Sequence, residues 1–243
     1  MYQKALLTLI AVATLTTASL AAPLQTPADT PSAPAPIPAW RAAILSRLNE
    51  LIQKNGPGTN TVLRDQLLKM ADEDHVSRGI QNGKQSSVTK EMAQQIPASD
   101  ARLTAELQLI VKQNGWPTIS LVGIDASNAA MLILSHTRDH DWQRQLLPQL
   151  QSLADTDKID GSQLAMTVDK ELVADGKLQR YGSQFKYFNG SLAMYAVEDP
   201  GDLDQRRAKA LLPPIAVYRQ ALADMYHIKA SDDVVMATPP PKK

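Results

Sequence analysis

Apolar residues recur at helical spacings over most of residues 40–228, so the sequence predicts a mainly α-helical protein. The first predicted helix carries one apolar stripe, which consists of Trp40, Ile44, Leu48 and Leu51. This helix is expected to end at Asn55-Gly56, because glycine commonly follows the last turn of a helix. Together, the spacings and the stop signals predict a single domain with about seven or eight helices.

The other predicted helices are bounded by capping residues, glycines and prolines. Four of them cover residues 61–78, 127–136, 139–154 and 160–173. A fifth would be capped by Ser99 or Asp100 and would run through Val111. Two more are expected near the C-terminus, one from Asp202 and one after Pro214. Asp160 is an expected N-cap, since its carboxylate can accept a backbone N–H of the first turn. Residues 80–90 are expected to form a loop.

Residues 179–197 are predicted to form one β-hairpin. Asn189-Gly190 is the preferred pair for a two-residue type I′ turn, so these residues are placed in the turn. The turn then sets the register, which pairs Phe188 with Ser191, Tyr187 with Leu192, Phe185 with Met194, and Ser183 with Ala196.

This register divides the first strand between two faces, because side chains alternate along a strand. Tyr181 and Phe185 are expected on the face that packs against the core. Arg180 and Gln184 are expected on the opposite face, unless a bulge at Gly182 redirects the chain.

Residues 1–21 have the composition of an export signal. Lys4 precedes an uncharged apolar run, and Ser19 and Ala21 provide the small residues of a cleavage site. We therefore expect the protein to be exported, either to the periplasm or out of the cell. The apolar run is too short to span a bilayer, so no stable membrane span is expected after cleavage.

Residues 22–39 are rich in proline and alanine and lack hydrophobic periodicity, which predicts a disordered linker. Residues 229–243 end in a proline and lysine cluster and are expected to form a disordered tail. The globular domain is therefore expected over residues 40–228, which is long enough to bury one sizeable core.

Composition excludes several classes of chemistry. The chain contains no cysteine, which rules out disulfides, thiolate catalysis and cysteine-bound metals. Its 25 Lys+Arg balance its 25 Asp+Glu without a basic cluster, so nucleic acid is not an expected partner. The chain has no glycine-rich nucleotide-binding motif and no G-x-S-x-G motif, so neither a nucleotide cofactor nor a serine-hydrolase elbow is expected.

His136 is the first candidate for acid–base chemistry. It shares a helical face with Leu132 and Ile133, so its imidazole is expected to be partly buried and to need a hydrogen-bond partner. A nearby carboxylate could tune it as a general base or acid, and the alternative is a core histidine with a structural hydrogen bond. His140 follows at i+4, but Thr137 replaces the glutamate of the zinc-protease motif, so no metal site is expected.

Asp169 is the second candidate. It shares a helical stripe with Ala165 and Leu172, so its carboxylate is expected beside the core, where it needs a cation or hydrogen-bond donors. Two interpretations are open: a pair with His136 for acid–base chemistry, or a pair with an arginine that locks the helix to the hairpin.

Several separated motifs occur in an order that resembles the bacterial family catalogued as domain of unknown function 6624. The motifs lie within about residues 60–220 and are "EDHVSR" (73–78), Asp100, "NGWPTISLVG" (114–123), "SH" (135–136), "QLLPQL" (145–150), "DK" (169–170), "DGKLQRYGSQF" (175–185) and "LDQRRAKALLPPIAVY" (203–218). The chain departs from the family pattern at Ser135, where the family has Gln, at Lys170, where it has Arg, and at Ser183, where it has Thr. Lysine lacks the planar two-point fork of arginine, whereas serine keeps the hydroxyl group of threonine.

The resemblance implies which positions to examine, and it implies no activity. These positions are His136, Asp169, Gln179, Tyr181, Gln184 and Arg207. The first hypothesis is a polar pocket for a small molecule or peptide between the His136 helix, the Asp169 helix and the hairpin. Its ligand-binding residues would be Gln179, Tyr181, Gln184 and Arg207. The second is a metal-independent hydrolase or transferase with His136 as general base oriented by Asp169. The third is a structural or protein-interaction domain in which these side chains satisfy one another.

Overall fold

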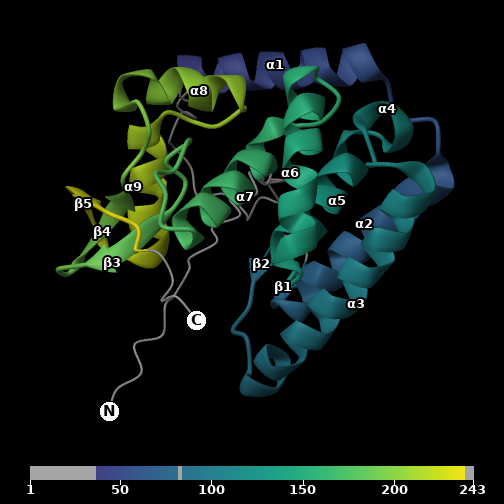
Figure 1. The fold of residues 1–243 in the computed structure, drawn as a ribbon, viewed down its shortest axis with the longest axis horizontal. Coiled ribbons are helices and arrows are strands. Elements are labelled where there is room, and N and C mark those ends of the chain that lie inside the picture. The colour runs from purple at the N-terminus through teal and green to yellow at the C-terminus, as the bar shows by residue number, and fades with distance from the viewer. Residues whose placement is uncertain (1–36, 82–83, 239–243) are drawn as a thin grey trace, which may run out of the picture.

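The computed structural model describes residues 37–81 and 84–238. The predicted export signal (1–21) and most of the predicted linker lie outside these residues. The described residues form a mainly helical single domain with one small three-stranded sheet, which confirms the predicted fold class (Figure 1).

Nine α-helices lie within the described residues, whereas about seven or eight were predicted. The additional helix is a single turn that follows Pro117. The α-helices are α1 (Ala39–Asn55), α2 (Thr61–Ser77), α3 (Lys90–Asn114), α4 (Ile119–Val122), α5 (Ile124–His136), α6 (His140–Asp155), α7 (Gly161–Ala174), α8 (Leu203–Lys209) and α9 (Ile215–Tyr226), with a 3₁₀ turn, η1, at Pro200–Asp202. The strands are β1 (Ile80–Gln81), β2 (Lys84–Gln85), β3 (Phe185–Phe188), β4 (Ser191–Tyr195) and β5 (Lys229–Val235).

Helix α5 is the centre of the larger core. It is apolar around most of its circumference, and residues from Ala126 to Leu134 are buried with few exceptions. Figure 1 shows α2 and α3 on one side of α5 and α6 and α7 on the other, while α1 runs along one edge of the molecule. This packing brings the end of α5 next to α2 and α7.

Two helix starts follow the predicted capping rule. The carboxylates of Asp139 and Asp160 accept the backbone N–H groups of Trp142 and Ser162 at 3.0 and 2.8 Å. The predicted start of α3 is wrong, because the helix begins ten residues earlier, after its cap Thr89. That first part is mostly exposed and contains Pro97, so it lacks both the apolar stripe and the composition that mark a helix in the sequence.

The predicted hairpin register is confirmed over strands β3 and β4. Its pairs are Phe185–Met194, Lys186–Ala193, Tyr187–Leu192 and Phe188–Ser191. The ladder stops there, and the further pair Ser183–Ala196 is not formed, because the chain leaves the strand at Gly182, whose φ is +65°. The segment before β3 is therefore a loop, neither a regular strand nor a bulged one.

Strand β5 corrects the prediction of a disordered tail at its first part. Residues 229–235 pair in parallel with β4 and complete the order β3-β4-β5. The sequence of β5 is polar and mostly exposed, because the strand lies at the sheet edge and its pairing rests on backbone hydrogen bonds. It therefore has no apolar alternation that would have indicated a strand. The short pair β1–β2 likewise forms within the segment predicted to be a loop.

The sheet packs against α9 in a second, smaller core, where Phe185, Leu192, Tyr218 and Leu222 are buried together. The residues directly after α8 pack against two other helices: Ala210 and Leu212 share a buried cluster with Ala165 of α7, and Leu211 shares one with Leu51 of α1. Within 37–81 and 84–238, no helix is both long enough and apolar enough to cross a membrane.

Candidate functional site

The last residue of α5, His136, lies against α2. Its Nδ1 is 2.9 Å from Oδ1 of Asp74, whose side chain is only 1% exposed. Residues 70 and 71 of α2 are buried in the larger core, which fixes the helix face that carries Asp74 toward α5. Helix packing therefore positions this pair.

The Asp74–His136 contact determines the histidine tautomer. An ionised carboxylate can only accept a hydrogen bond, so in the neutral imidazole Nδ1 of His136 carries the proton and Nε2 keeps its lone pair. No described residue forms a hydrogen bond with Nε2. Burial raises the pKa of Asp74, but the hydrogen bonds and charges of His136 and Arg78 outweigh it and lower that pKa below its ordinary value.

Arg78 connects this pair to a second carboxylate. Its guanidinium lies 3.1–3.2 Å from Asp74 and 2.5 Å from Oδ1 of Asp100 on α3. Burial raises the pKa of Asp100, while the charge of Arg78 acts in the opposite direction. The Arg78 side chain is 24% exposed, so the group reaches the protein surface at this point.

Lys170 of α7 adds a cation on the other side of the α5 end. Its Nζ donates to the carbonyl oxygen of Ser135 at 3.1 Å, and it forms no ion pair with a described carboxylate. Burial lowers the pKa of Lys170. The five residues Asp74, Arg78, Asp100, His136 and Lys170 are called the His136 cluster below.

Asp169, the neighbour of Lys170, points elsewhere. Its carboxylate is fully buried and accepts the backbone N–H groups of Arg180, Tyr181 and Ser183 at 2.7, 3.0 and 2.8 Å. Burial raises the pKa of Asp169, and these hydrogen bonds oppose that effect. Neither interpretation of Asp169 is therefore confirmed among the described residues: it pairs with neither His136 nor an arginine side chain, and Asp74 is the carboxylate that contacts His136.

Gln179 and Gln184 stabilise the same loop. The Gln179 side chain is fully buried, donates to the carbonyl oxygens of Gln184 and Tyr195 at 3.1 and 2.6 Å, and accepts the Gln184 N–H at 2.8 Å. The Gln184 side chain donates to the hydroxyl of Ser183 at 3.0 Å. Their amides thus close the loop, and neither residue takes the expected position in a pocket with His136.

Arg207 lies beneath this loop with no exposed surface. It donates to the carbonyl oxygens of Tyr181 and Pro213 at 2.6 and 2.7 Å, and its guanidinium carbon is 4.9 Å from the centre of the Tyr218 ring. Burial lowers its pKa to about 10. Tyr181 lines a cavity of about 140 Å³, which Arg47 and Asp157 also line.

The structure therefore separates the six residues predicted for one site. His136 belongs to the His136 cluster, and the other five hold the loop before β3 in place. The sequence hypothesis missed Asp74 as the partner of His136, and it missed Arg78, Asp100 and Lys170 as the other members of the His136 cluster. The i, i+4 spacing of Asp74 and Arg78 on a predicted helix was a usable signal for one ion pair, but no sequence pattern connects that helix to α5.

His140 is also placed by the structure. Its Nδ1 is 3.0 Å from Glu171, which Arg144 also contacts at 2.9 Å. Among the residues that the structure describes, no group of three or more His, Cys, Asp or Glu side chains is arranged to hold a metal ion.

The sequence was compared with curated proteins, solved structures and family models, and only a family model matches it. No curated protein and no solved structure matches the chain. A family model described as a family of unknown function, DUF6624, matches residues 61–231, which include all five residues of the His136 cluster and the loop around Asp169. The chain therefore belongs to the DUF6624 family.

Proposed function

We propose that the protein is a metal-independent hydrolase or transferase in which His136 acts as the general base. One observation carries this proposal: Asp74 fixes the proton of His136 on Nδ1, which leaves the Nε2 lone pair without a described partner. A general base needs a free lone pair, and the negative charge of Asp74 would stabilise the imidazolium that forms when Nε2 takes up a proton.

In the proposed reaction, Nε2 of His136 removes a proton from a water molecule or from a substrate hydroxyl group. None of the described serine or threonine hydroxyls forms a hydrogen bond with His136, which favours an external nucleophile over a protein one. Asp74 stays ionised and orients the imidazole, while Arg78 contacts both oxygens of Asp74 and holds the carboxylate in place.

Lys170 is the proposed contact for a negative charge on the substrate. One of its three N–H groups donates to Ser135, which leaves two for a carboxylate, a phosphate or a developing oxyanion. Arg78 already contacts two carboxylates, so Lys170 is the better-placed cation for this task.

We also propose that the protein acts outside the cytoplasm, on the basis of the composition of residues 1–21. The full chain would be expressed in a bacterium, and the N-terminal residue of the exported fraction determined. An N-terminus at Ala22 supports the proposal, whereas a cytoplasmic protein that keeps residues 1–21 contradicts it.

A panel of chromogenic carboxylic, phosphate and glycosidic esters tests the enzymatic proposal. Any substrate that wild type turns over should react at least about 100-fold more slowly with His136→Asn, since general-base catalysis contributes roughly 10²–10⁴-fold. The matched control is His227→Asn, an exposed histidine in the left-handed region, where asparagine is tolerated. Equal rates for wild type and a folded His136→Asn variant would overturn the proposal.

A further inference from the structure

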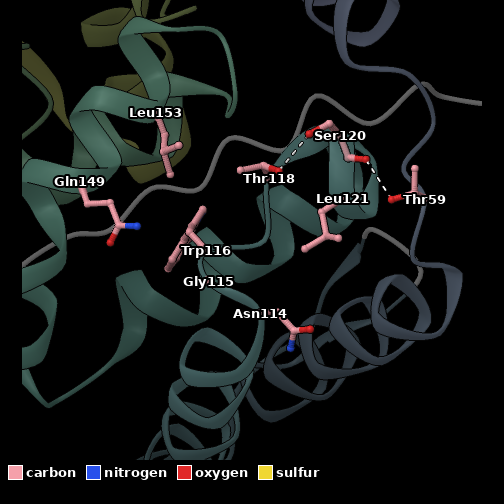
Figure 2. Close-up of a pocket in the computed structure, with 9 residues that line it drawn as sticks. All are labelled: Thr59, Asn114, Gly115, Trp116, Thr118, Ser120, Leu121, Gln149 and Leu153. Atoms are coloured by element: carbon pink, nitrogen blue, oxygen red, sulfur yellow. Dashed lines mark hydrogen bonds between the residues drawn. The ribbon is translucent and has the colours of Figure 1, made fainter.

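The motif "NGWPTISLVG" lies at the other end of α5 from the His136 cluster and belongs to a second feature. The residues around it line an open depression of about 440 Å³, which Figure 2 shows. The lining residues are Thr59, Asn114, Gly115, Trp116, Thr118, Ser120, Leu121, Gln149 and Leu153. Helix α5 has 13 residues, so this depression is roughly 20 Å from the His136 cluster, at 1.5 Å per helical residue.

The lining is polar but uncharged. It offers three hydroxyl groups, from Thr59, Thr118 and Ser120, and two side-chain amides, from Asn114 and Gln149, together with two leucines. None of the nine lining residues is acidic or basic, so the depression offers no counter-ion for a charged ligand. A neutral ligand with many hydrogen-bonding groups fits this surface best.

Several donors and acceptors of the lining lack a protein partner. Trp116 is 3% exposed, and its Nε1 is buried without a hydrogen-bond partner among the described residues. The Asn114 amide nitrogen donates to Ile110, which leaves its oxygen to accept, and the Gln149 amide forms no hydrogen bond with a described residue. A buried indole N–H is normally satisfied, so its lack of a partner next to a depression points to a ligand or ordered water.

The walls of the depression are held by backbone contacts. The N–H groups of Thr59 and Asn60 both donate to the carbonyl oxygen of Leu121, at 2.9 and 2.8 Å. A Cβ on Gly58 would lie 2.3 Å from the backbone nitrogen of Gly123, so only glycine allows this close approach. The loop between α1 and α2 is therefore fixed against α4, and the hydroxyl groups are presented in one arrangement.

We propose that this depression binds a neutral saccharide that carries acetamido groups. Sugar hydroxyls donate and accept as the threonine and serine hydroxyls do, and an acetamido oxygen suits the exposed, unpartnered amide N–H groups of Gln149. Leu121 and Leu153 offer apolar surface to the C–H faces of a sugar ring. This site is separate from the proposed catalytic centre and does not depend on it.

Binding is tested by NMR on the ¹⁵N-labelled protein with triacetylchitotriose as the probe. The sequence has three tryptophans, so the spectrum contains three indole N–H signals, and Trp40→Phe and Trp142→Phe assign the Trp116 signal by elimination. We expect the Trp116 signal to shift during the titration while the other two stay in place. Gln149→Ala should weaken binding about fivefold, which corresponds to one hydrogen bond of about 1 kcal/mol.

The controls separate this site from the rest of the protein. Gln145→Ala changes an exposed glutamine one turn earlier on α6 that does not line the depression, and it should bind as wild type does. His136→Asn should also bind normally, so loss of the enzymatic proposal would leave this one intact. A Trp116 signal that does not move at millimolar probe overturns the proposal. So does equal binding of the deacetylated, cationic trimer, or stronger binding of a blocked trialanine peptide.

Discussion

Asp169 and Arg207 are connected through the backbone of Tyr181, whose N–H donates to the carboxylate and whose carbonyl oxygen accepts from the guanidinium. The two distances are 3.0 and 2.6 Å, and both charged side chains have no exposed surface. The loop before β3 thus lies between opposite buried charges and contacts both of them through its backbone. This relationship explains why the loop adopts one conformation between α7, α8 and the sheet.

Asp169→Asn tests the importance of this connection. An amide keeps one acceptor oxygen but presents N–H groups to the backbone donors of residues 180–183, so we expect a loss of about 2–4 kcal/mol in the free energy of unfolding. Urea denaturation measures the change. Asp175→Asn, at an exposed position after the same helix, should change stability by less than about 0.5 kcal/mol. Equal stability of the two variants would show that the carboxylate does not hold the loop.

Gly182→Ala tests the turn that takes the chain out of the strand. An alanine there would adopt φ +65°, and its Cβ would lie 3.1 Å from the Met194 sulfur and 3.2 Å from Ile215. Gly190→Ala is the matched control, because Gly190 also has positive φ but a Cβ there would meet nothing within 4 Å. Both variants should lose about 1–2 kcal/mol from backbone strain, and Gly182→Ala should lose more. A smaller loss for Gly182→Ala would contradict the packing described around this loop.

Asp74 makes stability depend on pH in the acid range. Its pKa is lowered in the folded state from 3.8, so the folded protein binds the proton less readily than the unfolded chain does. The stabilisation is complete above the unfolded pKa and is lost as the pH falls through the lowered folded pKa. The stability difference between wild type and Asp74→Asn should therefore shrink when the pH falls below 3.8. A difference that grows at acid pH would mean that the Asp74 pKa is raised instead.

The sequence predicted local features of the fold well. Asp160 and Asn189-Gly190 carry signals for a cap and a turn within a few residues, and the structure confirms both. Strand β5 and the first part of α3 were missed, because both are polar and exposed and their structure depends on distant partners.

The candidate site was predicted only in part, for a similar reason. The burial of His136 and Asp169 beside the core followed from their helical faces, but the choice of partner did not. Asp74 is 62 residues from His136, and only the packing of α2 on α5 brings them together. The loop around Asp169 was also unpredictable, because backbone N–H groups occur at every residue and leave no signal in the sequence.

The state of the His136 ring is the most direct test of the central claim. Long-range ¹H–¹⁵N NMR of the neutral imidazole distinguishes the two tautomers. Wild type should have its proton on Nδ1 and a bare Nε2, and Asp74→Asn should lose this preference. A proton on Nε2 in wild type, or a tautomer that Asp74→Asn leaves unchanged, would contradict the proposal that Asp74 prepares His136 as a general base.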